Sequence, residues 1–575
     1  MEIPTNPRMR HQEPPEDGVG CEKMSGAVAL ALGTLLSRFL GFARDLLFAY
    51  ALGPGADAFL VVFRLPNFMR RMLAEGSLGL AYGAGAGATL AEKGLEATRR
   101  MARASAASLL LLALPVCLLL GLLAKPLVFC MAPGLDGGSL EHAAFLLRLC
   151  LLYIPFCIFS AVAFSQASLE GNFYPQAWSP VLWNCVILLA GTAAIVFAPT
   201  HGGIRTTEYF LCAGIVAGGL VQAAVALRCL YSGPVGLRWN VAYKESELFA
   251  RGTLADAGSG AGDCFSDTSG TNGLGHMRAL LPPPVVTFLR SFPKALLGSA
   301  SHQLHILAAM VAASFLFPGS ISSLYFAERL VELPLGVAGA SLGMAALPLF
   351  SRLAAEGDSQ GLAQALRLSL LRTTFLSLPA AAGLFALAHP LAQALFGHGV
   401  NTDSAVAATA AAISGYSFAV PALCASRPLL SGVHALAGGE ATMGCAVRSL
   451  APVVLFSFAA LLLYYTQEAA SDKPVFLVAL GISSAAWSNV VLLLAQLKKN
   501  GLALELGREK SALARYCGAA LFMGCVLLSA GFFWRTPGVF GTLLLAGGCA
   551  VFWFGLFYLS GSREARDFVA LFRLR

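Results

Sequence analysis

The sequence predicts an all-α polytopic membrane protein with about 14 transmembrane helices, arranged as two pseudo-symmetric six-helix bundles followed by two C-terminal helices. Composition is the first observation: 57% of the 575 residues are hydrophobic and 12% are charged, against roughly 25% charged residues in soluble proteins. Mean hydropathy is +0.71. The second observation is a series of long apolar runs, and the third is a polar segment that divides them into six and eight.

Each apolar run is long enough to cross a bilayer, which takes about 20 mostly apolar residues. In chain order the fourteen runs are 25–51, 66–91, 104–131, 142–168, 177–198, 207–231, 293–317, 324–350, 365–390, 405–432, 440–466, 474–497, 512–533 and 538–560. Charged residues make the second and eighth runs the least hydrophobic of the set.

Lysine and arginine residues gather in the loops that lie inside the cell if the N-terminus is inside. These residues fall mainly in the segments 8–23, 93–103, 228–278, 498–510 and 563–575. The positive-inside rule therefore predicts that both termini are cytoplasmic, which requires an even number of spans. The formal net charge of +8 fits this bias. Nucleic acid is not an expected partner, because no dense basic run with interleaved aromatic residues is present.

A polar linker separates the two predicted bundles. Its centre, 255–276, is rich in Gly, Ser, Asp and Thr and cannot bury enough apolar surface to fold alone. A short repeat supports the division, since SLGLA at 77–81 recurs as SLGMA at 341–345. The predicted organisation is a cytoplasmic tail (1–24), a first bundle (25–231), the linker (232–292), a second bundle (293–497), and two C-terminal helices with a basic cytoplasmic tail (498–575).

Metal binding has little support in the sequence. The fourteen cysteines form no CxxC pair and no Cys/His cluster at zinc spacing, so we predict no metal site. His302 and His305 lie one helical turn apart and are able to bind a metal or a proton. With no third ligand in view, packing or hydration of a cavity is the favoured interpretation.

Ionised residues are concentrated in two places at membrane depth. The stretch 37–76, from the first run into the second, contains Arg38, Arg44, Asp45, Asp57, Arg64, Arg70, Arg71 and Glu75, and the eighth run contains Glu328, Arg329 and Glu332. Such residues cost about 2.5 to 3.5 kcal/mol each on insertion scales, so they persist mainly where they face a wet cavity, a partner or a ligand. The two charged segments are therefore the candidate working centre.

Arginine suits the recognition of phosphate, because its forked, permanently charged group binds oxyanions bidentately. The arginine set therefore predicts a site for an anionic headgroup such as a pyrophosphate. On a helix Arg38 and Asp45 share a face while Arg44 points elsewhere. The structural alternative is that Arg38 pairs with Asp45 and Arg329 with Glu328 or Glu332, or that the arginines extend to the interface. Pro66 is expected to distort or start the second helix.

Four segments carry a resemblance to a known family. They are SRFLGFARD (37–45), GADAF (55–59), RLPNFMRRMLAEG (64–76) and YFAERLVELPLGV (325–337). Together they resemble the MurJ/MviN lipid II flippase family, within the multidrug, oligosaccharidyl-lipid and polysaccharide exporter superfamily. The resemblance implies a V-shaped central cavity, a lipid-facing groove formed by the last two helices, and alternating access. It also implies that lipid II, the undecaprenyl-pyrophosphate-linked peptidoglycan precursor, moves from the inner to the outer leaflet of the bacterial cytoplasmic (inner) membrane.

The resemblance also assigns residues. The family's cavity arginines, which bind substrate, fall on Arg38, Arg44, Arg70 and Arg329. Its acidic gate residue falls on Asp57. The acidic positions of the same motifs, expected in gating or supporting roles, fall on Asp45, Glu75, Glu328 and Glu332.

The implied partners are lipid II or a similar polyprenyl-pyrophosphate glycolipid, membrane lipids and proteins of cell-wall synthesis. No cofactor is implied, and coupling to sodium, protons or the membrane potential is left open. The chain departs from the family after the AEG motif, where a glycine-rich SLGLAYGAGAGA replaces the usual aromatic-Val-Pro. The alternatives are an exporter of another lipid-linked glycan or of drugs, and a membrane acyltransferase, suggested by the HxxxxD pattern from His398 to Asp403.

Overall fold

The computed structural model describes residues 19–73, 77–201, 203–232, 282, 285, 286, 289, 301–342, 346–466, 472–504, 507, 509–533, 538–560, 562 and 566. Across these ranges the chain is helical and contains no β-strand, which confirms the all-α class. In chain order the elements are α1 (Val19–Leu52), η1 (Gly53–Ala56), α2 (Asp57–Leu73), α3 (Ser77–Leu122), α4 (Ala124–Met131), α5 (Gly137–Leu151), α6 (Tyr153–Leu169), α7 (Tyr174–His201), α8 (Gly203–Ser232), α12 (Ser301–Ala313), α13 (Ser320–Leu342), α14 (Ala346–Ala355), α15 (Ser359–Ala386), α16 (Ala388–Phe396), α17 (Asp403–Ser417), α18 (Ala419–Arg448), α19 (Ala451–Thr466), α20 (Lys473–Lys499), α21 (Lys510–Phe533) and α22 (Val539–Leu559).

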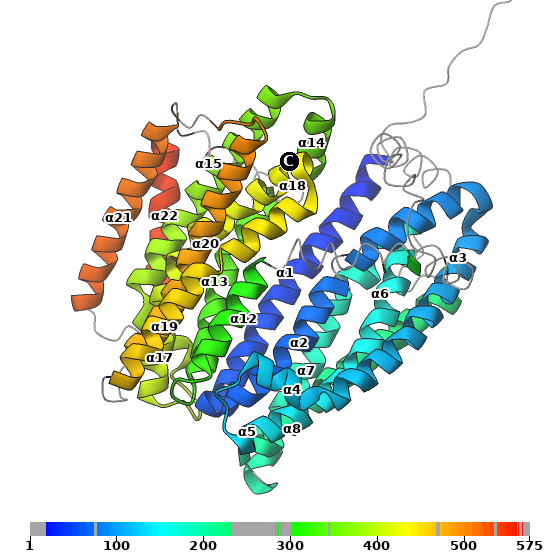
Figure 1. Ribbon diagram of the computed structural model, residues 1–575, viewed down its shortest axis with the longest axis horizontal. Helices are drawn as coiled ribbons and strands as arrows, with labels where there is room; N and C mark the ends of the chain where they lie inside the picture. Colours follow the sequence, from blue (N-terminus) through cyan, green and yellow to red (C-terminus); the bar gives the residue numbers. More distant parts are fainter. Residues whose placement is uncertain are drawn as a thin grey trace, which may run out of the picture.

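The helices form two groups that lie side by side. Figure 1 shows α1 to α8 in one group and α12 to α20 in the other, with α21 and α22 at the outer edge of the second group. The two C-terminal helices pack on α15, and α22 also packs on α16. The domain boundaries given above stay a prediction, since most of the segment 233–300 lies outside the described residues.

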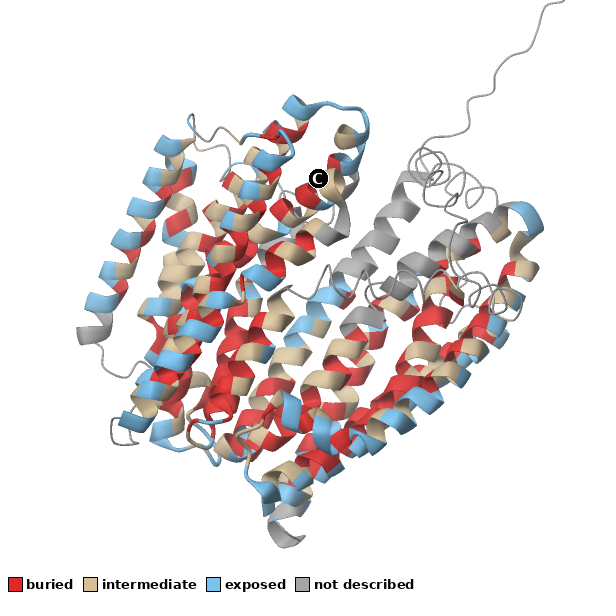
Figure 2. Ribbon diagram, viewed as in Figure 1, coloured by how far each residue is buried: buried red, intermediate tan, exposed pale blue. Residues whose placement is uncertain are grey.

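Length and apolar surface identify the helices that cross a membrane. Nine helices of the described chain are long and apolar enough, or ten if the bent pair Asp403–Ser417 and Ala419–Ala437 is one span. This number is compatible with fourteen predicted spans, because some spans are represented by shorter helices such as α12, which has 13 residues. Leu122 and Leu559 are 72% and 87% exposed, and exposed residues follow the outer face of α21 in Figure 2. Apolar surface on this scale is stable in lipid rather than in water.

The chain reverses direction between α1 and α2. The 3-10 turn η1 joins the two helices, and the ring centroids of Phe48 and Phe59 lie 5.1 Å apart across the reversal. The second helix begins at Asp57, so Pro66 lies inside it and does not start it. The turn is already made by the glycines and proline of η1. Inside a helix a proline only forfeits the hydrogen bond to the carbonyl four residues earlier and bends the helix.

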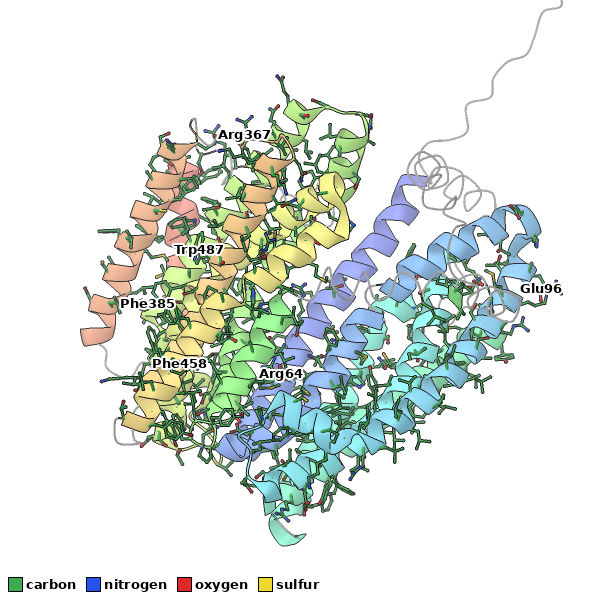
Figure 3. All side chains as sticks on the ribbon, in the orientation of Figure 1. Arg64, Glu96, Arg367, Phe385, Phe458 and Trp487 are labelled. Atoms are coloured by element: carbon green, nitrogen blue, oxygen red, sulfur yellow. The ribbon has the colours of Figure 1, made fainter. Side chains whose placement is uncertain are left out.

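A glycine turns α3 back toward the membrane. Gly94 has φ +76° and ψ −179°, a conformation essentially confined to glycine. The predicted spans 66–91 and 104–131 meet at this turn, which lies at the edge of the molecule beside Glu96 in Figure 3. Arg99, which follows the turn, forms an ion pair of 2.7 Å with Glu170 of α6. The basic residues predicted for a loop therefore anchor α3 to its neighbour.

The two groups meet at one end of the molecule, here termed the closed end. The backbone N–H of Val400 donates to the carbonyl of Tyr50 at 3.2 Å, and the Asn401 amide donates to the carbonyl of Ala49 at 2.8 Å. The N–H of Gly134 donates to Ser314 Oγ at 2.9 Å. Toward the other end the groups diverge in Figure 1, and apolar residues near the middle of α1, such as Leu35, Leu36 and Phe39, are exposed.

Candidate functional site

Arg44 and Asp45 form a buried ion pair on α1. The Nε and Nη2 atoms of Arg44 donate to Asp45 Oδ1 at 3.0 and 2.7 Å, and its Nη1 donates to Asn184 Oδ1 on α7 at 2.8 Å. The Asn184 amide in turn donates to the backbone carbonyl of Ser37 at 3.1 Å. Arg44 and Asp45 are only 4% and 2% exposed. Such a group is stable at this depth because its charges are paired and hydrogen-bonded.

The Asp45 carboxylate also reaches the other helical group. Tyr325 of α13 donates its hydroxyl to Asp45 Oδ1 at 3.1 Å, and Arg329 Nε lies 3.4 Å from Asp45 Oδ2. Asp45 is thus shared by an arginine from each group. The pairing of Asp45 with Arg38, which the structural alternative required, is not the one formed, because the flexible Arg44 side chain folds back onto its neighbour and Arg329 approaches from α13.

A second set of charges continues along α13. Arg329 Nη1 donates to Glu332 Oε2 at 2.5 Å, while its contact with Glu328 is long, at 4.0 Å. Glu328 pairs instead with Arg64 of α2 at 3.1 Å, and the guanidinium of Arg329 lies 4.6 Å from the ring centre of Tyr325. The predicted Arg329–Glu332 pair is present, and Arg64 forms a second ionic link between the groups. Figure 3 shows Arg64 between them.

Trp183 of α7 contacts two of the predicted substrate arginines. The guanidinium carbons of Arg70 and Arg44 lie 5.3 and 5.6 Å from its ring centre. The ring is fully buried, its Nε1–H donates to the carbonyl of Ile215 at 3.3 Å, and Phe63 stacks on it at 6.0 Å. Cations are attracted to the face of an indole ring. The tryptophan therefore holds Arg44 of α1 and Arg70 of α2 beside one rigid surface.

Arg38 lies at the exposed margin of the cluster. Its side chain is exposed, and its guanidinium contacts the backbone of α13 at Gly336 so closely that a methyl group there would collide with Nη1. Gly336 thus allows Arg38 to cross from α1 to α13. This arginine faces the region where the two helical groups diverge.

Asp57 joins the two groups at the closed end. Its carboxylate accepts hydrogen bonds from the N–H of Gly319 at 2.7 Å, the N–H of Ser322 at 2.8 Å and the Ser322 hydroxyl at 2.5 Å. These donors belong to the first turn of α13, where free N–H groups and the helix dipole favour an anion. The predicted gate residue is therefore an N-terminal cap supplied by the opposite group.

One predicted site residue cannot be placed. Glu75 lies outside the described residues, and the side chain of Arg71 is likewise not described. The other predicted residues divide between two locations. The ion cluster contains Arg38, Arg44, Asp45, Arg70, Glu328, Arg329 and Glu332, and the closed end contains Asp57.

The residues that were assigned roles from the sequence do not include three that complete the cluster: Tyr325, Trp183, and Arg64, which was counted in the charged stretch but given no role of its own. Arg64 and Tyr325 do stand in the motifs RLPN and YFAERL, so their position beside predicted site residues was a usable signal. The sequence contains no such signal for Trp183, because a tryptophan in an apolar run cannot be distinguished from an ordinary core residue. Only the packing of α7 against α1 brings it to the arginines.

Positive charge exceeds negative charge among the described side chains of this cluster. Five arginines, from α1, α2 and α13, accompany the three carboxylates of Asp45, Glu328 and Glu332. Within the described part of the chain, the buried Nε atom of Arg64 has no hydrogen-bond acceptor. Unsatisfied guanidinium donors and surplus positive charge are properties of an anion site.

The HxxxxD segment has a structural role. The loop between α16 and α17 contacts α1 through Val400 and Asn401, as described above, and Thr402 caps α17 by accepting from the N–H of Ala405 at 3.3 Å. His398 is exposed and lines an open cavity of about 390 Å³ whose other lining residues, such as Leu46 and Leu395, are largely apolar. The spacing is explained by the docking of this loop against α1.

Two helical groups that are tied at one end, with a cationic cluster between them, define a two-bundle membrane transporter. More particularly, the chain belongs to the lipid II flippase MurJ family, whose family model matches residues 48–547. It is 30% identical over 404 residues to the probable lipid II flippase MurJ of Vibrio cholerae serotype O1, covering 68% of this chain and 69% of that protein. It is 28% identical over 558 residues to the probable lipid II flippase MurJ of Bdellovibrio bacteriovorus, covering 94% and 95%.

Solved structures show the same fold. A lipid II flippase MurJ in an inward closed conformation superposes with a TM-score of 0.62 at 19% identity, covering 93% of this chain and 99% of that one. An inward-facing multidrug resistance transporter of the MATE family, from the MOP superfamily, gives 0.56 at 16% identity, covering 85% and 99%. The family indicated by the four motifs is confirmed. Membership in a transporter family decides against the membrane acyltransferase.

Proposed function

We propose that this protein is a lipid II flippase, which carries the undecaprenyl-pyrophosphate-linked peptidoglycan precursor from the inner to the outer leaflet of the bacterial cytoplasmic membrane by alternating access. The observation that carries the proposal is the buried surplus of arginine where the two helical groups meet. A drug-cation exporter would need carboxylates in excess there. A pyrophosphate needs several forked donors.

Substrate binding exchanges ion pairs in this scheme. The pyrophosphate is the anion that competes with Asp45 and Glu332 for Arg44 and Arg329, assisted by Arg38 and Arg70, while the polyprenyl tail stays in lipid beside α21 and α22. Releasing Asp45 from Arg329 removes a direct link between α1 and α13. The groups then become able to rock about the site, which is the general scheme for transporters built from two repeats.

Orientation follows from the basic loops. With both termini in the cytoplasm, the closed end faces outward, and the divergent region around Arg38 faces the cytoplasm, where the precursor is made. A membrane potential that is negative inside favours outward movement of an anionic headgroup by about 2.3 kcal/mol per charge per 100 mV. Proteins of cell-wall synthesis are proposed partners that consume the flipped precursor.

Rescue of a strain depleted of its own lipid II flippase tests the function directly. We expect the wild-type protein to restore growth and to expose lipid II at the outer leaflet, measured with an external lipid II-cleaving enzyme. A well-expressed protein in the membrane that never restores either readout would contradict the proposal. In that case another polyprenyl-linked glycan becomes the favoured substrate.

Replacing Trp183 with leucine is expected to impair this rescue strongly, whereas Trp183→Phe retains most of it. Leucine removes both cation–π contacts, each worth about 0.5 to 2 kcal/mol, but phenylalanine keeps an aromatic face for Arg44 and Arg70. The matched control is Trp487→Leu, which alters a 46% exposed tryptophan on α20 far from the cluster. Growth is compared at equal membrane levels. Equal loss in the leucine and phenylalanine variants would mean that the aromatic face is not what matters.

A further inference from the structure

A buried histidine on α12 is not used by the arginine cluster. His305 is 1% exposed, and its Nε2 lies 2.8 Å from Ser449 Oγ. The Ser449 hydroxyl donates its proton to the carbonyl of Ala446 at 2.7 Å. Because a hydroxyl has one proton and this one is directed to Ala446, we assign the hydrogen of the contact with Ser449 to Nε2. The neutral ring then presents a bare, basic lone pair at Nδ1.

That lone pair has no partner. Within the described residues, His305 Nδ1 is buried and accepts no hydrogen bond. An unsatisfied buried acceptor is unfavourable unless a ligand uses it. A metal ion is a poor candidate, because no group of three or more His, Cys, Asp or Glu ligands occurs in the part of the chain that the structure describes. The ligand that fits a single basic nitrogen is a proton.

The surroundings disfavour a charged ring in this conformation. The helices packed on α12 are α4, α13, α18, α19 and α20. Arg448 of α18, next to Ser449, is exposed, and Glu328, Arg329 and Glu332 of α13 are engaged in the ion cluster. The side chain of Glu440 on α18 lies outside the described residues. His302 lies one turn earlier on α12. Among the described residues no carboxylate pairs with His305, so a buried imidazolium would lack compensation from them in this conformation.

The histidine also touches a helix joint. Ser449 and Leu450 separate α18 from α19, and the N–H groups of both residues still bond to the last turn of α18, at 3.0 and 3.2 Å. His305 thus connects α12 to the point where α18 gives way to α19. Protonation at Nδ1 adds a donor that needs water or an acceptor. The protonated protein therefore favours a conformation in which this joint opens.

We propose that His305 is a proton-binding site, which takes up a proton in one conformation and releases it in the other, so that transport is coupled to a proton gradient. The coupling to transport rests on the proposed flippase function. The binding site itself rests on the geometry of His305 and Ser449.

The test uses the full-length protein in liposomes containing lipid II, with the membrane potential clamped by potassium and valinomycin. We expect an imposed pH gradient to change the wild-type flipping rate by up to about tenfold per pH unit, since one unit is a factor of ten in proton concentration. His305→Gln, whose amide can still donate to Ser449, is expected to flip at a rate that no longer responds to the gradient. His434→Gln is the matched control, an exposed histidine on α18, and is expected to respond as wild type does.

Three results would overturn the inference: no gradient response in the wild type, an unchanged response in His305→Gln, or loss of the response in His434→Gln. If His305→Gln does not fold, Ser449→Ala keeps the titratable ring but removes its partner and should shift the pH at which the rate is half-maximal. An unshifted midpoint would also overturn it. Absence of any flipping by the wild type at every pH would instead contradict the proposed function.

Discussion

Arg329→Ala is expected to abolish rescue of a lipid II flippase depletion strain. Arg329 is 8% exposed, lies 2.5 Å from Glu332 and 3.4 Å from Asp45, and packs on Tyr325. Removing it takes one cation away from both Asp45 and Glu332 and leaves Asp45 with Arg44 alone, in a buried cluster at membrane depth. Breaking a buried pair in this way costs about 3 to 5 kcal/mol. That energy corresponds to a factor of 100 or more, at roughly tenfold per 1.4 kcal/mol.

The variant also separates a substrate role from a structural one. Arg352→Ala is the matched control, because Arg352 of α14 pairs with Glu356, the residue that follows the helix, but the Arg352 side chain is 76% exposed. We expect it to grow normally. Arg38→Ala, Arg44→Ala and Arg70→Ala are expected to fail as well, each at normal membrane levels. If all four well-expressed cluster variants rescued growth, the arginines would be structural and the site assignment would be wrong.

Much of the site was predictable because its residues stand in four compact motifs. An apolar sequence makes its few charged residues conspicuous, here Arg44, Asp45, Arg329 and Glu332. A charge at membrane depth is energetically costly and persists mainly where it has a partner or a ligand. Their pairing was not predictable. Helical periodicity placed Arg38 and Asp45 on one face, whereas the ion partners of Asp45 depend on how α13 approaches α1. That approach joins residues about 280 positions apart, as in the hydrogen bond between Tyr325 and Asp45.

For the fold too, features set by local sequence were predictable, and features set by contacts between distant segments were not. Apolar run length located the membrane helices, and the charge-rich turn at Gly94 was visible as a loop. The start of α2 was not predicted correctly. A proline can begin a helix but is also tolerated inside one, as Pro66 is here. The docking of Val400 and Asn401 on α1 carried no sequence signal either. A short polar loop has the same composition whether it is free or bound.

Cross-linking the closed end is expected to stop transport reversibly. The backbones of Tyr50 and Val400 are joined by a hydrogen bond of 3.2 Å, and Asp57 holds the first turn of α13 beside them. Alternating access requires these contacts to separate when the outer side opens. In Tyr50→Cys/Val400→Cys, a short bis-methanethiosulfonate linker should therefore lower flipping in proportion to the cross-linked fraction, and a reductant should restore it. Flipping is measured in liposomes and the linked fraction by intact mass.

The control is a second pair of cysteines that the same linker can join but that lie within one helical group. Lys125 and Glu141 form an exposed ion pair of 2.9 Å between α4 and α5, both in the first group. Linking cysteines at those positions should leave flipping unchanged, since α4 and α5 stay together in a rocking motion. Wild-type protein treated in the same way reports on native thiols such as the exposed Cys130. Normal flipping with the Tyr50 and Val400 positions fully linked would show that the closed end does not open during transport, and the mechanism would have to be replaced.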